Sequence, residues 1–313
     1  MLKSPFILDT RPTPYCAFMT DDQEAILNYV ADGAEKGGAA LVTLVEIRGG
    51  ASRSLGAQMA VLADGSYCGY LSGGCAEAAV AAEALEALRG GSDRCLRLGQ
   101  GSGIFDIVLP CGGGITLAIH VVRDTKPLRQ VLSGLGRRRR IALGYDPDAQ
   151  SIAAVKAPDG GGAGWMEKSF VRSYRPNLRL ILCGRGIELE AATRLAVASE
   201  LQVFSFDERS QRPEFDEGDI DPDTAVVVLF HDLDHERPWL EAALKRKAFY
   251  IGALGSRETH KRRCSELWAS GFTRVQTDRI KAPIGIFGPA RDARALALSA
   301  IADVVSVYST SAW

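Results

Sequence analysis

From residue 178 to residue 308, short apolar runs alternate with longer stretches in which apolar residues recur at helical spacing. The short runs, which predict strands, cover residues 178–183, 201–207, 224–230 and 249–253. The longer stretches, which predict helices, cover residues 188–198, 239–246, 257–270 and 293–308. Strands that alternate with helices in this way form βαβ units, and βαβ units build a parallel sheet.

The first strand-to-helix turn of this half resembles the dinucleotide-binding turn of the Rossmann fold. Gly184 and Gly186 stand directly between strand and helix, and Asp207 ends the next strand, where an acidic residue contacts the ribose hydroxyls. Leu189 occupies the third glycine position, and Glu188 adds negative charge where a pyrophosphate would dock. We therefore expect a Rossmann-like fold with weak or absent NAD(P) binding. Alternatively, the glycines only form a tight turn.

The first half of the chain has a different order of elements. Helices are predicted over 25–34, 75–88 and 126–135, and strands over 39–47, 56–62, 67–71, 95–98, 105–109, 115–122 and 141–145. This order predicts a mixed sheet with helices, the α+β pattern, while residues 157–164 are expected to form a flexible loop. A polar break with Pro176 places the domain boundary at about 174–177. The predicted domains are residues 1–174 and 175–313.

Two cysteines of the first domain stand beside glycine pairs. Gly73 and Gly74 lead into Cys75, which is expected in the first turn of a helix, where the helix dipole favours a thiolate. Cys75 could instead be a packing residue. Glu77 could accept a hydrogen bond from a ligand or cap the helix.

A second cysteine, Cys111, precedes Gly112 and Gly113 at another break between strands. The thiols of Cys75 and Cys111 could converge on one ligand, or they could be two unrelated buried thiols. Residues 48–56 offer hydroxyl groups, flexible backbone and guanidinium groups, including Arg53, a set that is suited to an oxyanion. The alternative for these residues is an exposed polar loop.

Composition excludes several other classes of protein. Lys and Arg number 37 and Asp and Glu number 38, so the basic excess of a nucleic-acid-binding protein is missing. Apolar runs are too short to predict a membrane span, and residues 1–16 do not have the pattern of a signal peptide. The odd number of cysteines, 7, without a C-x-x-C pair indicates a reducing, cytoplasmic compartment. His231 and His235 do not match a zinc pattern.

Taken together and in order, these motifs resemble the XdhC/CoxI family of xanthine dehydrogenase accessory factors. The stretches that carry the resemblance are residues 48–77, 109–119, 178–196, 206–210, 226–236, 249–263 and 280–288. Among them are the Gly255-Ser256-Arg257 and Pro283-Ile284-Gly285 turns. The chain departs from the family pattern where Gly-Arg-Gly-Ile stands in place of Gly-Ala-Gly-His.

The resemblance implies an N-terminal XdhC/CoxI domain and a C-terminal Rossmann-like domain, in a protein that forms a homodimer. Such a protein binds molybdenum cofactor and helps to insert it into a molybdenum hydroxylase such as xanthine dehydrogenase, while a cysteine desulfurase supplies the sulfido ligand. Cys75 and Cys111 become the candidate cofactor and metal contacts. The glycines that would shape the loops around the cofactor are Gly73, Gly74, Gly112 and Gly113.

Two functions of different classes are therefore compared. The first is a cofactor chaperone without turnover of its own, in which thiolates contact the metal and Arg53 contacts the pterin phosphate. The second is an NAD(P)-dependent oxidoreductase that uses Gly184, Gly186 and Asp207. The sequence has no Tyr-x-x-x-Lys pair for hydride transfer, which favours the chaperone. A third hypothesis is a scaffold whose Rossmann-like domain only dimerises.

Overall fold

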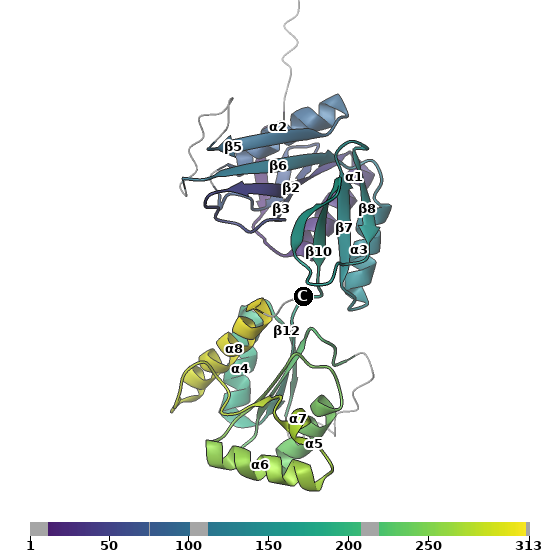
Figure 1. The fold of residues 1–313 in the computed structure, drawn as a ribbon. Helices are drawn as coiled ribbons and strands as arrows, with labels where there is room; N and C mark the ends of the chain where they lie inside the picture. The colour runs from purple at the N-terminus through teal and green to yellow at the C-terminus, as the bar shows by residue number, and fades with distance from the viewer. Residues whose placement is uncertain (1–11, 75, 101–111, 208–218, 311–313) are drawn as a thin grey trace, which may run out of the picture. The chain divides into compact units, whose positions relative to one another are not determined.

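A computed structural model describes residues 12–74, 76–100, 112–207 and 219–310 of the chain. It divides into two compact units, unit 1 over Met1–Tyr174 and unit 2 over Arg175–Ala312. Figure 1 shows each unit with its own sheets and helices. The first unit contains two sheets and the second contains one.

Unit 1 is built on a six-stranded sheet, sheet A, with the strand order β1-β4-β3-β2-β6-β5. Its strands are β1 (Tyr15–Phe18), β2 (Ala39–Arg48), β3 (Gln58–Leu62), β4 (Ser66–Gly69), β5 (Arg94–Gly99) and β6 (Gly114–Val121). All neighbouring strands pair antiparallel except β1 and β4, which pair in parallel. A tight turn that contains Asp64 and Gly65 joins β3 to β4.

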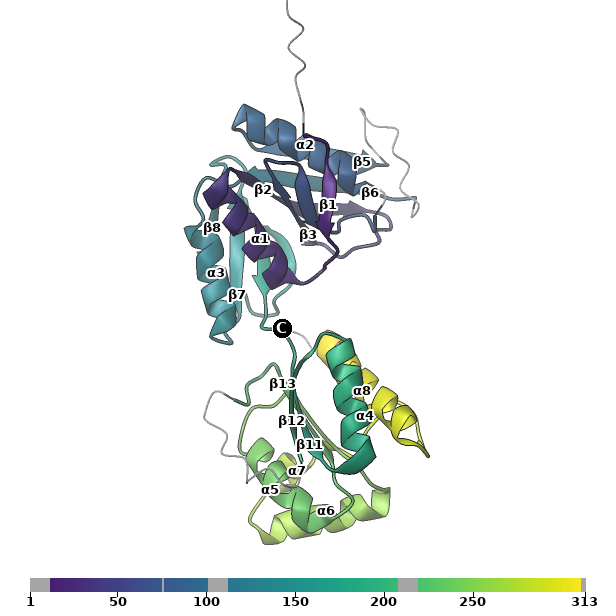
Figure 2. The same cartoon turned by 180° about the vertical axis from the view of Figure 1, so that it is seen from behind.

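Helices cover both faces of sheet A because its central strands are apolar on both sides. Helix α2 (Glu77–Gly90) packs on one face with Val42, Leu117 and Ile119. Helices α1 (Gln23–Lys36) and α3 (Lys126–Gly136) pack on the other face with Leu41 and Ala60. Figure 2 shows α1 and α2 on opposite sides of the sheet.

A second, four-stranded sheet, sheet B, completes unit 1 with the order β8-β7-β10-β9. Its strands are β7 (Ile141–Asp146), β8 (Ser151–Val155), β9 (Ala163–Met166) and β10 (Ser169–Tyr174). Only β7 follows from the sequence. The expected loop over 157–164 is wrong at its end, because β9 begins at Ala163 and pairs with β10. Strands this short, with mostly half-exposed residues, carry little apolar periodicity.

Unit 2 is a parallel sheet with the order β12-β11-β13-β14-β15. The strands are β11 (Arg179–Gly184), β12 (Gln202–Phe206), β13 (Thr224–Leu229), β14 (Tyr250–Ala253) and β15 (Ile280–Lys281). The helices are α4 (Gly186–Ala198), α5 (Leu233–Leu244), α6 (Arg257–Ala269), α7 (Arg274–Thr277) and α8 (Ala293–Thr310). The predicted Rossmann-like α/β architecture is confirmed, as is the α+β pattern of unit 1.

The helices of unit 2 lie on both faces of its sheet. Leu180 and Leu182 of β11 pack with α4 and α8, whereas Ile181 and Cys183 pack with α5 and α6. Figure 2 shows α4 beside α8 on one side of the sheet. Helix α5 begins six residues before the predicted start at 239.

The early start of α5 has a local cause. The Asp232 side chain accepts hydrogen bonds from the N–H groups of Asp234 and His235, which caps the helix there. His235 therefore lies in the first turn of α5.

Candidate cofactor-binding site

Three glycine-containing loops meet at one edge of sheet A. The loop after β2 lies against Gly73 on one side, where an added Cβ would be 3.4 Å from Ser52 Oγ. The same loop lies against Gly113 on the other side, where an added Cβ would be 2.0 Å from the Gly50 carbonyl oxygen. Only glycine permits this approach at position 113. The segments that flank Cys75 and Cys111 therefore contact one common loop.

Arg48, at the end of β2, holds the strand ends at this edge. Its Nε donates to the carbonyl oxygen of Gln100 at 3.1 Å, and its Nη1 donates to Thr116 Oγ1 at 2.6 Å. The Gln100 N–H donates in turn to the carbonyl oxygen of Gly113 at 3.1 Å. These bonds fix the residues on both sides of segment 101–111.

Glu77 organises the glycine loop that precedes α2. Its buried carboxylate accepts hydrogen bonds from the N–H groups of Leu71 at 2.9 Å, Ser72 at 2.8 Å and Ala76 at 3.1 Å, and from the Ser72 hydroxyl at 2.9 Å. Burial opposes ionisation, but these bonds outweigh it and hold the pKa of Glu77 below its usual value. The expected helix cap is not seen, since α2 has no side-chain cap bond and the Glu77 carboxylate binds the preceding loop instead. A bond from a ligand to Glu77 stays a prediction.

The predicted start of the helix at Cys75 is wrong. Helix α2 begins at Glu77 with Ala76 as its N-cap, two residues after the predicted start. Cys75 and Cys111 themselves lie outside the described residues. Whether their thiols face one ligand stays a prediction.

Arg53 lies in the loop after β2, as expected, and contacts the end of β4. Its guanidinium is 3.3 Å from the exposed Asp21 carboxylate and 5.6 Å from the centre of the Tyr70 ring. A pair this exposed contributes little to stability, so an anionic ligand can replace Asp21 at small cost.

The remaining cysteines of the described chain differ in exposure, and Cys264 is partly buried. Cys68 and Cys183 are buried, and burial raises the pKa of Cys68 to about 12, so these thiols stay protonated. Cys16 and Cys95 are exposed. Within the described residues, no group of three His, Cys, Asp or Glu side chains could hold a metal ion.

In the predicted dinucleotide turn of unit 2, packing and backbone conformation account for the two glycines. A Cβ on Gly184 would be 2.9 Å from Leu229 Cβ, so close packing with β13 requires glycine there. Gly186 has a φ of 67° at the start of α4. Leu189 is buried in the core beneath α4, and Glu188 Oε1 lies 3.4 Å from His231 Nε2. Asp207 follows β12 and is exposed.

We expect NAD⁺ and NADP⁺ to bind with dissociation constants above about 100 µM, or −5.5 kcal/mol. Glu188 places a carboxylate in the first turn of α4, where a pyrophosphate needs positive potential. Isothermal titration calorimetry with each nucleotide tests this. A low-micromolar constant that disappears in an Arg185→Ala variant would contradict it, because Arg185 would then compensate for the acidic turn.

Two family models match this chain, one in each of its two units. A model of the XdhC and CoxI family matches residues 34–99, and a model of the XdhC Rossmann domain matches residues 180–304. The chain is 50% identical over 295 residues to the molybdenum cofactor insertion chaperone PaoD of Escherichia coli K12, covering 94% of this chain and 91% of that protein. The chain belongs to the XdhC and CoxI family, which confirms the resemblance.

Two further similarities are more distant. The uncharacterized protein YqeB of Escherichia coli K12 is 27% identical over 276 residues, which span 87% of this chain and 44% of that protein. A crystal structure described as a xanthine dehydrogenase from Bacillus halodurans superposes with a TM-score of 0.70 at 18% identity, over 92% of this chain and 96% of that one. At this identity the similarity shows the fold alone. In the described part of the chain, no helix is long and apolar enough to cross a membrane.

Proposed function

We propose that this protein is a molybdenum cofactor insertion chaperone that serves a xanthine dehydrogenase-type molybdenum hydroxylase. The observation that carries the proposal is the 50% identity, over nearly the whole of both chains, to a protein with that name. Such a protein binds and delivers its cargo and has no turnover of its own. An oxidoreductase that uses unit 2 is disfavoured by Glu188 and Leu189.

The convergence of the glycine loops supports a cargo site at the edge of sheet A in unit 1. Gly73, Gly74 and Gly112 have φ values of 82°, 108° and 68°, and such turns expose backbone N–H groups to an anion. Cys75 and Cys111 would supply soft thiolates to molybdenum or its sulfur ligands, and Arg53 would contact the pterin phosphate.

The proposal extends to partners and compartment. A cysteine desulfurase would supply the sulfido ligand while the cofactor is bound, and the apo-hydroxylase would receive the finished cofactor. The chain would act as a homodimer in the cytoplasm, where thiols stay reduced. The Rossmann-like unit 2 would serve as a docking or dimerising domain, with Gly184, Gly186 and Asp207 shaping its loops.

The test is the molybdenum and pterin content of protein purified from cells that make the cofactor. We expect Cys75→Ser and Cys111→Ser each to lower retained molybdenum at least about tenfold, or 1.4 kcal/mol in affinity, because a serine hydroxyl is a hard, protonated ligand. The melting temperature should change little, since the exchange is nearly isosteric. Cys264→Ser, in unit 2, is the matched control. A wild-type protein without molybdenum or pterin, or a Cys75→Ser protein that retains both, would contradict the proposal.

A further inference from the structure

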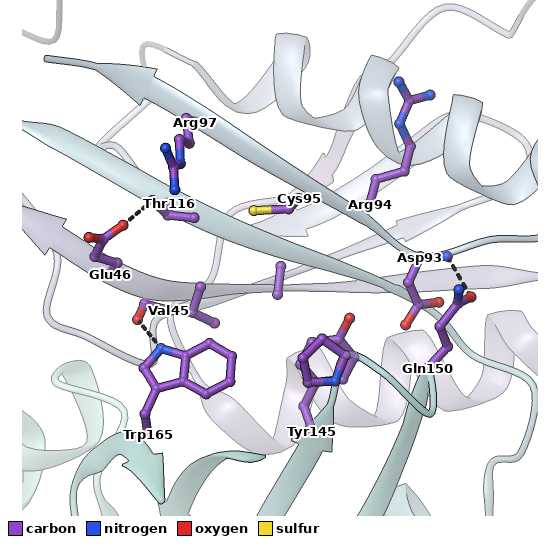
Figure 3. Close-up of a pocket in the computed structure, with 12 residues that line it drawn as sticks. Val45, Glu46, Asp93, Arg94, Cys95, Arg97, Thr116, Tyr145, Gln150 and Trp165 are labelled. Atoms are coloured by element: carbon purple, nitrogen blue, oxygen red, sulfur yellow. Dashed lines mark hydrogen bonds between the residues drawn. The ribbon is translucent and has the colours of Figure 1, made fainter. Parts of the chain in front are cut away.

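A cavity of about 510 Å³ lies within unit 1, between sheet A and sheet B. This volume is typical of small-molecule sites. Figure 3 shows Trp165 and Tyr145 rising from sheet B, while Cys95, Arg97 and Thr116 come from sheet A. Thr116 also accepts the bond from Arg48 at the loop edge described above, and the cargo site as described uses none of the other four side chains.

Trp165 gives the cavity an open aromatic wall. Its indole N–H donates to the carbonyl oxygen of Val45 at 3.2 Å, and its ring meets Phe170 edge-on with centroids 5.5 Å apart. The residue as a whole is nevertheless 49% exposed. A large aromatic side chain that is fixed by such contacts and still exposed can stack on a flat ligand at little entropic cost.

Glu46 provides a fixed negative charge on the cavity wall. Its Oε2 accepts hydrogen bonds from Thr116 Oγ1 at 2.5 Å and from Arg48 Nη1 at 2.6 Å. The Thr116 bond, helped by Arg48, outweighs desolvation and lowers the pKa of Glu46. Because both bonds go to Oε2, Oε1 keeps its capacity to accept a bond from a ligand. A carboxylate so held suits a ligand amino group, whose N–H can donate to Oε1.

The carboxylate at the other end of the cavity is already used by the protein. Asp93 Oδ2 lies 2.7 Å from His120 Nδ1, and its Oδ1 accepts from the Val121 N–H at 3.0 Å and from Arg123 Nη1 at 2.9 Å. Of the two carboxylates that line the cavity, Glu46 is therefore the one that keeps an oxygen for a ligand.

Arg48 connects the cavity to the glycine loops. The same guanidinium contacts Glu46 and Thr116 in the cavity wall and the Gln100 carbonyl at the loop edge. Arg97, on β5, adds a second positive charge to the wall. A ring bound at Glu46 would lie beside the loops that carry the cargo site.

We propose that this cavity holds a pterin ring, stacked on Trp165 with its 2-amino-4-oxopyrimidine edge on Glu46. The inference rests on the proposed function, since the pterin is the organic part of molybdenum cofactor. It places the pterin ring in this cavity and leaves the metal to the glycine loops. Guanine nucleotides have the same hydrogen-bonding edge, so the experiment must separate the two sources.

Alkylation of Cys95 reports on occupancy without any mutation, because this exposed thiol lines the cavity. The full chain is treated with iodoacetamide at increasing pterin-6-carboxylate, and the modified peptides are quantified by mass spectrometry. We expect protection of Cys95 that saturates, while exposed Cys16 on β1 reacts at an unchanged rate. No protection of Cys95, or equal protection by guanosine monophosphate, would overturn the pterin assignment.

Variants test the contacts. Trp165→Ala should weaken pterin-6-carboxylate binding by roughly ten- to a hundredfold, the loss expected when one stacked base loses its aromatic partner. Glu46→Gln should weaken it by about tenfold or more, as loss of a charge-assisted bond predicts. Trp268→Ala is the matched control, since Trp268 is a half-exposed tryptophan of unit 2 with its N–H bonded to Thr277. Wild-type affinity in both cavity variants would refute the contacts.

Failure of this inference is distinguishable from failure of the proposed function. A wild-type chain that retains molybdenum cofactor, with Cys95 unprotected by pterin-6-carboxylate, overturns the cavity assignment alone. A chain that retains no cofactor, but whose Cys95 is protected by pterin-6-carboxylate, overturns the chaperone function and supports the cavity assignment.

Discussion

Replacing Arg263 with alanine should lower the free energy of unfolding of unit 2 by about 3–5 kcal/mol, as expected when one partner of a buried ion pair is removed. Arg263 and Glu236 are 2% and 1% exposed. The guanidinium donates through Nε and Nη2 to both oxygens of Glu236, and Nη2 also donates to the Leu254 carbonyl at 2.6 Å. Alanine would leave a buried carboxylate and a partly buried carbonyl without this donor.

Urea denaturation of the full chain tests this, with hydrogen exchange of the β13 amides reporting on unit 2. The matched control is Lys261→Ala, which removes only an exposed pair with Glu258 from the same helix and should leave the curve unchanged. A double variant, Arg263→Met with Glu236→Leu, should recover much of the loss, because it leaves neither charge buried. An Arg263→Ala protein with wild-type stability would show that the pair contributes nothing.

The Arg263–Glu236 ion pair lies at the edge of the sheet where the parallel strands end. Leu254 belongs to the turn between β14 and α6, and Glu236 belongs to α5. Arg263 therefore ties two helices and one loop together at the carboxyl edge of the parallel sheet. In open α/β sheets this edge is where ligands or partners bind. Loss of the pair should loosen that edge before the rest of unit 2.

Unit 2 was predictable because its determinants are local. In a parallel sheet buried on both faces, strands are continuous apolar runs, and the helices between them have their own periodicity and caps. Ser256 caps α6 by accepting from the Thr259 N–H, and Gly271 follows its end. The short α7 and β15 were missed, since four and two residues carry no measurable period.

The site of unit 1 was predictable only in part. The glycine pairs at 73–74 and 112–113 marked the loops, because glycine is the residue that such turns require. The contact of those loops with residues 50 and 52 depends on strand order, which the sequence does not display. The cavity is harder still, since the bond from Trp165 to Val45 joins residues 120 positions apart on different sheets.

Replacing Glu77 with alanine should abolish retention of molybdenum cofactor and lower the free energy of unfolding of unit 1 by roughly 3–5 kcal/mol, since each buried donor left unpaired costs about 1–3 kcal/mol. The carboxylate of Glu77 holds the N–H groups of Leu71, Ser72 and Ala76. These bonds bracket Gly73, Gly74 and Cys75. Without them the loop loses the shape on which the proposed cargo site depends.

Glutamine should be intermediate, because its carbonyl oxygen can keep the Leu71 and Ser72 bonds while its amino group faces the Ala76 N–H. The pH dependence of stability distinguishes wild type from Glu77→Gln further. Since the folded pKa of Glu77 is lowered, its contribution to stability is fully present above the ordinary glutamate pKa of 4.5 and is lost as the pH falls through the folded value. The stability difference between wild type and Glu77→Gln should therefore narrow on acidification.

Glu86→Gln is the matched control for this series. Glu86 lies on the same helix α2, but its pair with Arg89 is exposed, and such pairs contribute about 0–1 kcal/mol. Denaturation curves at neutral and acidic pH, with molybdenum analysis of the same preparations, give both readouts. If Glu77→Ala were as stable as Glu86→Gln and retained its molybdenum, the Glu77 carboxylate would not organise the loop.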